Sequence, residues 1–365
     1  MKALKRIILF AILSQFLWAN ILVVDLAGGG DFTSIHTAVD DAVAGDSILI
    51  TSGTYILSVD DGAITVDKAL HIMGSGYDLP ALGGTLLQSS TQVFDFTSSA
   101  DGSTLSGLRI NGNGSPLINV SADDMIIEDN HIRNNRSQGH IMQLNTVSSD
   151  TIRNNIFTFN ENIGYRPGIN LVQGTDLVIS NNIFSNFSQY GAVYVNTCIN
   201  AKIVNNIFLH SQYATYAIGS ATIANNIYMN NSSASYVQSG SPDILNNCFF
   251  NNTGDGTTGV DPILGDDPDF VDFTSTDLYG GSSYDEDGFD FNLQASSPCI
   301  NTGYVLIDFN DLNGSRNDMG IYGWKWPMGT NGAPRLPNIN QISVTPSGIA
   351  PGGTISIEVI GRFGD

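Results

Sequence analysis

The phrase Ile203-Val-Asn-Asn-Ile-Phe208 decides the fold, because close copies of it recur along the middle of the chain. Each copy has an apolar residue, any residue, two asparagines, a small apolar residue and an aromatic residue. The other copies are Ile152-Arg-Asn-Asn-Ile-Phe157, Ile179-Ser-Asn-Asn-Ile-Phe184, Ile223-Ala-Asn-Asn-Ile-Tyr228 and Ile244-Leu-Asn-Asn-Cys-Phe249, with a weaker one at Ile127-Glu-Asp-Asn-His-Ile132. The second Asn recurs at intervals of 25, 27, 24, 20 and 21 residues, the length of one β-helix coil. A two-layer β-sandwich, the alternative fold, would not require this fixed phase.

Each period also holds a second extended run, upstream of its Asn pair. These runs are 141–144, 169–172, 192–195 and 216–218. We therefore expect three short strands per coil, two of which meet at the Asn pair. Asn tolerates left-handed backbone at a corner, and its amide can bond the same amide one coil above and below. The ladder is expected to consist of Asn155, Asn182, Asn206, Asn226 and Asn247.

Strand-like runs continue toward the N-terminus at 47–56, 63–73, 84–88, 93–96 and 104–110. One helix is expected between residues 30 and 45, covering the otherwise bare edge of the first coil. Its apolar face would hold Ile35, Ala38, Val39, Ala42 and Val43, and its cap would be Asp31, Thr33 or Ser34. The sequence thus predicts an all-β fold, a single-stranded right-handed parallel β-helix over 20–326 with an N-terminal capping helix.

Residues 1–19 are typical of a secretory signal peptide. Lys2, Lys5 and Arg6 precede twelve uncharged, mostly apolar residues, a run too short for a comfortable membrane span. Cleavage near Ala19 would remove three basic and no acidic residues, taking the net charge from −21 to −24. Such a charge disfavours nucleic acid and anionic membranes as partners. We therefore expect a monomer that is secreted to the extracellular space or cell surface and has no membrane span.

The end of the chain differs in composition. Residues 327–338 are rich in Pro, Gly and Asn, as in a linker, and 339–365 alternate apolar and polar side chains. Turn phrases such as Pro346-Ser-Gly and Gly361-Arg-Phe-Gly-Asp365 resemble part of an immunoglobulin-like IPT/TIG domain. Two strands cannot bury a core, so this short C-terminal β segment is expected either to be truncated or to dock on the helix.

Stretches at both ends of the coil resemble the pectin lyase-like superfamily, which includes pectin methylesterases and pectate lyases. The opening stretch is Gly29-Gly-Asp-Phe-Thr-Ser-Ile-His36. The closing phrases, Ser297-Pro-Cys-Ile-Asn-Thr-Gly303 and Arg316-Asn-Asp-Met-Gly-Ile-Tyr-Gly323, are similar to the last coils of secreted bacterial right-handed β-helix proteins. The resemblance spans 21–326 and implies the fold more than the reaction. Of the Arg-x-Pro-x-x-Arg phrase of pectate lyases, the chain has only the fragment Arg166-Pro167.

In superfamily members that act on sugar chains, the groove follows the first strand of each coil and the loop before it. The resemblance places that groove beside tyrosines that recur about once per coil. Such rings could stack on successive sugars through their apolar faces, or could simply cover loop backbone. The ligand-binding candidates are Tyr165, Tyr190, Tyr194, Tyr213 and Tyr216, together with Arg133 and Arg136.

Few residues near that groove are suited to acid–base chemistry. Elimination from a uronate needs a base and a cation on the carboxylate, so Arg166 or His140 with bound calcium is one pairing, and Glu161 is a further candidate. Each could equally be a surface polar residue without a catalytic role. Calcium is the expected cofactor if there is one, and its candidate ligands in the loop before Gly314 are Asp308, Asn310, Asp311 and Asn313.

Three cysteines cannot form a disulfide framework, so the core must hold the fold. Cys248 and Cys299 are the expected pair if a disulfide forms, and buried free thiols are the alternative. The leading functional hypothesis is an extracellular protein that binds polysaccharide or cell-surface glycan along its tyrosine-lined loops. The alternatives are a calcium-dependent polysaccharide lyase or glycoside hydrolase, and a structural surface or adhesion stalk.

Overall fold

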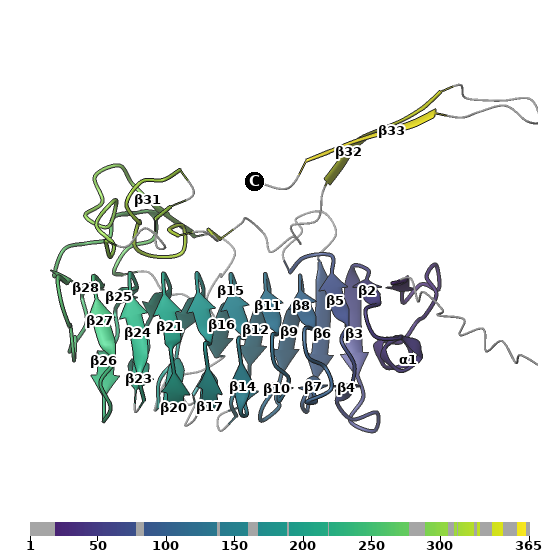
Figure 1. Cartoon of the computed structure of the whole chain (residues 1–365), viewed down its shortest axis with the longest axis horizontal. Helices are drawn as coiled ribbons and strands as arrows, with labels where there is room; N and C mark the ends of the chain where they lie inside the picture. Colours follow the sequence, from purple (N-terminus) through teal and green to yellow (C-terminus); the bar gives the residue numbers. More distant parts are fainter. Residues whose placement is uncertain are drawn as a thin grey trace, which may run out of the picture.

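The structure is a computed structural model. It describes residues 19–77, 84–136, 139–159, 167–187, 190–217, 219–276, 289–305, 310–311, 313–324 and 327–328, and the backbone of 338–345 and 356–362. The main body is a parallel β-helix whose coils are stacked along one axis (Figure 1). Three parallel sheets, here called sheets A, B and C, form its walls. The predicted all-β solenoid is confirmed.

Successive coils place their strands side by side in each sheet. Sheet A contains β1 (Ile21–Val24), β2 (Ser47–Ile50), β5 (His71–Gly74), β8 (Thr104–Ser106), β11 (Ile126–Glu128), β15 (Thr151–Arg153), β18 (Val178–Ser180), β21 (Ala201–Val204), β24 (Ala221–Ala224) and β27 (Asp243–Leu245). Sheet B contains β3 (Gly53–Leu57), β6 (Thr85–Ser89), β9 (Arg109–Gly112), β12 (His131–Asn134), β16 (Ile156–Phe159), β19 (Ile183–Ser185), β22 (Ile207–Leu209), β25 (Ile227–Met229), β28 (Cys248–Phe250) and β29 (Ile263–Leu264). Sheet C contains β4 (Ile64–Val66), β7 (Phe94–Phe96), β10 (Ile118–Val120), β13 (Met142–Leu144), β17 (Ile169–Thr175), β20 (Val193–Ile199), β23 (Tyr213–Ala217) and β26 (Ser233–Val237), with β14 (Val147–Ser148) beside β17.

The register stacks equivalent residues of the repeat on one another, as the fixed phase predicts. In sheet B, Phe157, Phe184, Phe208, Tyr228 and Phe249 form one column through the core, with ring centroids 4.9–5.0 Å apart and ring planes within 10° of parallel. That distance is the spacing of neighbouring strands, so every ring packs on the next without leaving a gap. The column buries a large apolar area along the solenoid.

The two asparagines of each phrase have separate roles at the corner between sheets A and B. The first residue of the pair has left-handed backbone, with φ between 46° and 59°, at Asp129, Asn154, Asn181, Asn205, Asn225 and Asn246. The second is buried and forms the internal amide ladder: Asn130, Asn155, Asn182, Asn206, Asn226 and Asn247 are joined by Nδ2–Oδ1 hydrogen bonds of 3.0–3.1 Å. The ladder is confirmed, but the left-handed role, expected of the same residue, belongs to its neighbour.

Helix α1 (Ile35–Asp41) closes the N-terminal end of the solenoid, as predicted (Figure 1). Ile35, Ala38 and Val39 are buried in the main core. Val43 was expected on this face but is 37% exposed, because the helix ends two residues earlier. Ser34 is the N-cap, without a side-chain capping bond.

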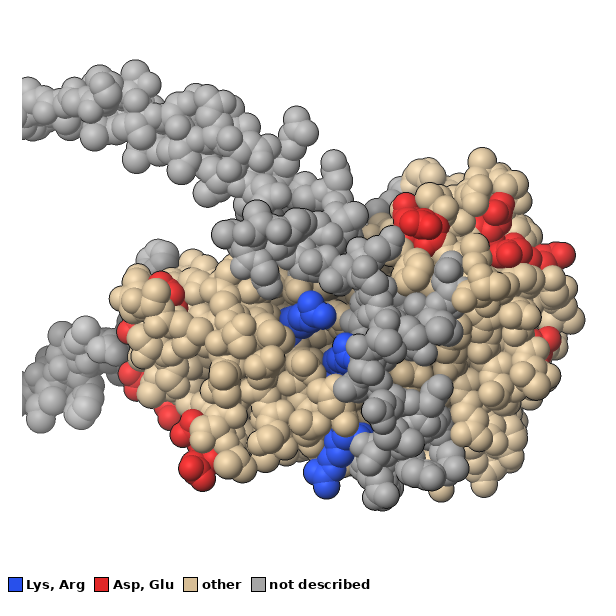
Figure 2. Space-filling view, turned by 180° about the vertical axis from the view of Figure 1, so that it is seen from behind, with Lys and Arg blue, Asp and Glu red and all other residues tan. Residues whose placement is uncertain are grey.

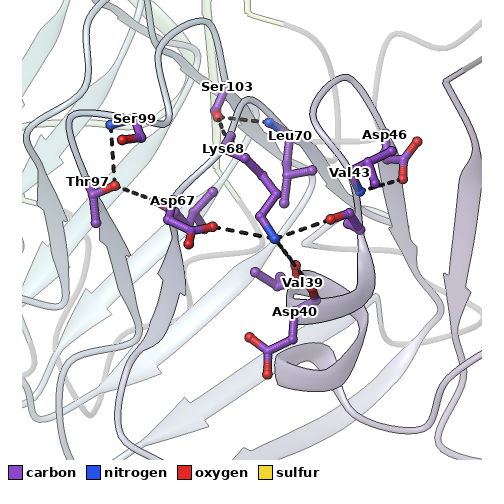
Figure 3. A network of polar contacts seen from close by, with 12 residues as sticks. Val39, Asp40, Val43, Asp46, Asp67, Lys68, Leu70, Thr97, Ser99 and Ser103 are labelled. Carbon is purple, nitrogen blue, oxygen red and sulfur yellow. Dashed lines mark hydrogen bonds and ion pairs between the residues drawn. The ribbon is translucent and has the colours of Figure 1, made fainter. Parts of the chain in front are cut away.

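One lysine of the following coil holds the C-terminal end of α1. Lys68 Nζ donates to the carbonyl oxygens of Val39, Asp40 and Ala42 at 3.2–3.3 Å and lies 3.4 Å from the Asp67 carboxylate (Figure 3). The last carbonyls of a helix lack partners within the helix and carry partial negative charge, so an ammonium group there stabilises the cap.

The segment after the last coil folds back over the outer face of sheet B. It includes the antiparallel pair β30 (Phe270–Asp272) and β31 (Asp290–Leu293). Phe270, Phe291 and Ile321 pack with Ile183 and Ile207 of the sheet. Met328 joins this cluster, and the predicted domain boundary at 326 stays a prediction. Strands β32 (Asn338–Thr345) and β33 (Ser356–Arg362) form an antiparallel pair, and an IPT/TIG relationship for this segment stays a prediction.

Candidate functional site

A single column of side chains runs along the outer face of sheet C. Its inward neighbours, such as Phe94 and Val193, are completely buried, so the alternating positions face outward. In order along the axis, the parallel register aligns Thr65, Asp95, Asn119, Gln143, Asn170, Tyr194, Tyr216 and Tyr236. The column therefore has a polar half over β7 to β17 and a tyrosine half over β20 to β26.

The tyrosine half is a cluster rather than a row of separate rings. Tyr216 lies at its centre, with ring centroids 5.1 Å from Tyr194, 4.8 Å from Tyr236, 5.9 Å from Tyr213 and 6.5 Å from Tyr190. Tyr194 and Tyr216 are stacked, whereas Tyr213 meets Tyr216 edge-on. The structure thus brings together four of the five predicted tyrosines and adds Tyr236; Tyr165 lies outside the described residues.

The stacking changes what these rings can offer a ligand. Tyr216 lies between Tyr194, on which it stacks, and Tyr236, to which its ring is tilted, and its hydroxyl donates a hydrogen bond to Gln238 Oε1. These neighbours limit the ring surface that Tyr216 can offer, and stacking of the column on successive sugars stays a prediction. The most accessible rings are Tyr190, 48% exposed, and Tyr236, 40% exposed.

Tyr190 is held in an unfavourable backbone conformation. Its φ is 73°, in the left-handed region, and Gly191 follows with φ 86°. Left-handed backbone costs a residue with a side chain roughly 1–2 kcal/mol. Such strain is typical of functional positions, and here it fixes the ring beside Tyr216 at the edge of the cluster.

The polar half of the column is linked by hydrogen bonds between its amides. Asn119 Nδ2 donates to Asp95 Oδ1 at 2.7 Å, and Asn170 Nδ2 donates to Gln143 Oε1 at 2.7 Å. Asn145, beside the column, donates to Asn119 Oδ1 at 2.8 Å and accepts from Gln143 Nε2 at 3.1 Å. These residues are only partly buried, so their remaining donors and acceptors face solvent in fixed positions.

The described strands β17, β20, β23 and β26 themselves contain no Asp, Glu, Lys, Arg or His. Burial, followed by the neighbouring Tyr190, raises the pKa of Tyr194. Burial, followed by Tyr236 and Tyr194, raises the pKa of Tyr216. Both hydroxyls are therefore neutral at physiological pH and able to donate and accept hydrogen bonds.

The two arginines predicted to accompany the tyrosines lie elsewhere. Arg133 projects outward from β12 of sheet B, in register with Asn111, and Arg136 follows it in the turn toward sheet C. Sequence spacing assigned them to the loop before sheet C, but β12 extends through Asn134 and includes Arg133. The structure therefore does not bring Arg133 and the tyrosines onto one face.

The catalytic candidates are not brought together in the described part of the chain. His140 lies just before β13, where its carbonyl accepts a hydrogen bond from Asn134 Nδ2 at 2.9 Å. Glu161 and Arg166 lie outside the described residues. Asp95 is the one carboxylate of the outward column, and sequence reasoning missed it because its strand has no copy of the Asn phrase.

The described residues of the calcium loop form a turn whose oxygens already have partners. Asp311 accepts hydrogen bonds from the backbone N–H groups of Trp324 and Asp318 at 2.8 and 3.1 Å. Asn313 Oδ1 accepts the backbone N–H of Ser315 at 2.8 Å. Burial raises the pKa of Asp311, and no three His, Cys, Asp or Glu side chains of the described chain could together hold a metal ion. Asp308 lies outside those residues, Asn310 Nδ2 lies 3.5 Å from the carbonyl of Gly314, and calcium binding stays a prediction.

Sequence reasoning also missed the role of the first Asn of each pair. Asn181 Nδ2 donates to the carbonyls of Ile321 and Gly323 at 2.9 and 2.8 Å. Asn205 Nδ2 donates to Asn317 Oδ1 at 2.8 Å, and Asn225 Oδ1 accepts the N–H of Tyr304 at 2.7 Å. These outward amides attach the returning C-terminal segment to the wall of the solenoid. The signal for this role in the sequence was that an Asn recurs at the first position of the pair in successive copies of the phrase.

The three cysteines are buried and free in the structure. Cys248 and Cys299 lie together: a hydrogen bond between the two thiols, and then burial, raises the pKa of Cys248. Their proximity agrees with the expected pairing, and a disulfide between them stays a prediction. Among the described residues no helix is long and apolar enough to cross a membrane.

Comparisons with known proteins found matches to other β-helix proteins. Residues 84–225 match the family described as right handed beta helix region. The solved structure of pectate lyase Pel9A aligns with a TM-score of 0.51 at 16% identity, over 82% of this chain and 95% of the lyase. An alginate lyase from Paenibacillus sp. str. FPU-7 aligns with a TM-score of 0.42 at 14% identity, over 67% of this chain and 98% of that chain. A pectin methylesterase from Aspergillus niger aligns with a TM-score of 0.33 at 13% identity, over 76% of this chain and 90% of that chain.

No curated protein sequence matches the chain significantly. At these identities the pectate lyase alignment establishes the fold alone, including the hand of the coil, and not the reaction. The repeat, the three parallel sheets and the family match agree on one architecture. The chain therefore has the right-handed parallel β-helix fold.

Proposed function

We propose that this protein binds a polysaccharide along the outer face of sheet C. The observation that carries the proposal is the outward column in which three neighbouring tyrosines continue a row of hydrogen-bonded amides. Carbohydrate sites combine flat aromatic surface with neutral hydrogen-bonding groups, and both occur here in one line. A linear glycan lying along the axis would meet a new side chain at every coil.

The four strands β17, β20, β23 and β26 contain no charged residue, and this favours a neutral glycan at the tyrosine cluster. A uronate chain would bring repeated negative charge to a protein of net charge −21, with no cation in those strands to offset it. Sugar hydroxyls, by contrast, match the amides and the tyrosine hydroxyls. We propose that Tyr190 and Tyr236 supply the stacking surface and that Tyr194, Tyr216, Asn170 and Gln143 supply hydrogen bonds.

Hydrolysis or lyase activity is the second candidate, and the carboxylate Asp95 in the same column favours it. A hydrolase of the usual kind needs two carboxylates flanking the scissile bond. In the described part of the outward column Asp95 is the only one, and Asn119 donates to it at 2.7 Å. Activity would therefore require a further group beyond this column, such as Glu161.

A glycan array combined with a product assay separates these functions. The mature chain is applied to arrayed neutral and acidic plant, algal and bacterial glycans, and each polysaccharide that binds is then incubated with the protein and examined for new chain ends. Binding of a neutral glycan without new ends supports the proposal. New ends, abolished by Asp95→Asn, support the enzyme. Absence of binding to every glycan leaves the structural stalk and contradicts both.

A further inference from the structure

The outer face of sheet B is divided into two halves of opposite character. One outward column begins with Thr54, Leu86, Arg109 and His131 and continues through Ile156, Ile183, Ile207, Ile227 and Cys248. The apolar part is buried beneath the returning C-terminal segment. His131, which is 2% exposed and meets the ring of Tyr77 edge-on, still belongs to the covered part, and Arg109 on β9 is the partly exposed polar residue beyond it.

The polar half gathers arginines on a strongly acidic protein. Arg109 on β9 and Arg133 on β12 face outward on adjacent strands, and Arg136 is exposed just after β12. Figure 2, which shows the molecule from behind, has Lys and Arg side chains midway along this face and Asp and Glu toward its margins. Strands β3, β6, β9 and β12 contain no acidic residue.

Several other cations of the described chain have structural partners. Lys68 caps α1, Arg153 pairs with Glu128 at 2.6 Å, and Arg316 donates to the carbonyls of Gly303 and Thr302. No such contact with a described carboxylate involves Arg109 or Arg136. The described part of the chain therefore supplies no carboxylate partner for these two charges, and like charges placed near each other cost free energy unless an anion joins them.

A groove lined with amides and hydroxyls adjoins the arginines. Its volume is about 350 Å³, and its lining is Ile56, Leu57, Gln88, Ser89, Ser90, Asn111, Asn113 and Asn135. Asn111 is the register neighbour of Arg133. The side-chain amide of Asn135 donates a hydrogen bond to Asn111 Oδ1. The neutral hydrogen-bonding groups of the groove therefore lie on the same strand as the arginines or on the strand next to them.

We propose that this face, over β6, β9 and β12, is a second binding site that takes an acidic oligosaccharide. A guanidinium group forms paired hydrogen bonds to a carboxylate or a sulfate, and the amides and hydroxyls of the groove suit the hydroxyls of the same sugar. A nucleic acid fits less well, because the groove has no aromatic ring for base stacking and the chain is acidic overall. The site is on a different sheet from the tyrosine cluster and does not depend on it.

The test is calorimetric titration of the mature chain with trigalacturonate, which carries carboxylates, and with a sulfated κ-carrageenan tetrasaccharide. Binding of either probe, weakening as salt is raised, is expected, and the preferred probe identifies the anion. The Arg109→Gln/Arg136→Gln double variant should bind roughly tenfold more weakly or worse, at an unchanged melting temperature. Arg136→Gln alone, at an exposed position, should show part of the loss. Lys202→Gln, which removes one exposed positive charge from sheet A, is the matched control and should bind normally.

Three results would overturn the proposal. The first is that neither probe binds the parent protein. The second is that the double variant binds as tightly as the parent, or that Lys202→Gln loses as much, which would indicate a general charge effect. The third is that Tyr216→Ala abolishes binding of the acidic probe, which would assign it to the face of sheet C.

Discussion

Asn205 and Asn206 are consecutive in the chain, yet their amides serve opposite sides of the solenoid wall. Asn206 Nδ2 donates inward to Asn226 Oδ1 at 3.0 Å, one step of the buried ladder. Asn205 Nδ2 donates outward to Asn317 Oδ1 at 2.8 Å, across 112 residues of sequence. The left-handed φ of 57° at Asn205 turns the chain between these two directions.

Replacing Asn206 by Leu should lower the free energy of unfolding by about 1–3 kcal/mol, because Asn182 and Asn226 would each lose a buried hydrogen-bond partner. Chemical denaturation followed by circular dichroism measures the change. Asn196→Leu, at a half-buried outward position of β20, is the control and should change stability by less than about 0.5 kcal/mol. Equal stability of the two variants would count against the ladder as a source of stability.

Replacing Asn205 by Gly should loosen the returning segment while leaving the corner intact. Gly accepts the left-handed backbone, but the bonds from Asn205 Nδ2 to Asn317 Oδ1, Asp318 O and Gly320 O are lost. Amide hydrogen exchange should become faster around 317–323 and stay unchanged in β6 to β12. Asn200→Gly, at a similar φ of 58° but exposed, is the matched control. Unchanged exchange at 317–323 would contradict the attachment role.

The free energy of unfolding should fall as pH rises, because the buried carboxyl group of Asp150 must then lose its proton. It is 1% exposed, and burial raises its pKa from 3.8 to about 8, with Asp123, Asp124 and Asp101 adding to the rise. The folded state therefore holds a proton that the unfolded state releases between about pH 4 and pH 8, so stability falls over that window by up to about 1.4 kcal/mol per pH unit. Below pH 4 both states are protonated and the effect disappears.

Asp150→Asn should flatten this part of the pH profile and raise stability at pH 7, since the amide is neutral and its oxygen can still accept the N–H of Met125. Denaturation at a series of pH values measures it, with Asp176→Asn, at an exposed residue, as control. Parallel profiles for Asp150→Asn and the parent would show that the buried carboxyl is not protonated.

Lys68→Met should release the C-terminal end of α1, because three carbonyl groups lose a charged donor. A loss of about 1–3 kcal/mol is expected, since hydrogen bonds to charged groups contribute more than neutral ones. Hydrogen exchange should become faster in Ile35–Asp41 before it does in the inner coils. Lys202→Gln is the control. If α1 in Lys68→Met is as well protected from exchange as in the parent, the capping role is refuted.

The fold was predictable because it depends on local, repeated chemistry. The Asn phrase returns at fixed phase, and stacking makes each copy the partner of the next, so the period revealed the coil, the ladder and the aromatic column. The face that α1 buries was also readable from the spacing of Ile35, Ala38 and Val39. Val43 was assigned wrongly because the end of a short helix depends on capping geometry, which here comes from Lys68 in another coil.

The candidate site was only partly predictable, because coil spacing fixes which residues share a column but not how their rings orient. Tyr194 and Tyr216 were correctly grouped, yet their mutual stacking depends on rotamers that no repeat encodes. The sequence assigned Arg133 to a loop. The end of β12 depends instead on its pairing with β9 and β16, and the repeated Asn phrase carries no information about that pairing. Asn205 was read as half of a motif, and its partner at Asn317 is too distant in sequence to infer.

The most direct test of polysaccharide binding on sheet C is the affinity of the protein and its tyrosine variants for the neutral oligosaccharide selected by the glycan array. Tyr190→Ala and Tyr236→Ala should each weaken binding by about tenfold, because each removes an exposed ring that supplies stacking surface. Val59→Ala, at an exposed apolar residue after β3, should leave the affinity unchanged. If both tyrosine variants bind as tightly as the parent at equal melting temperature, the face of sheet C is not the binding site.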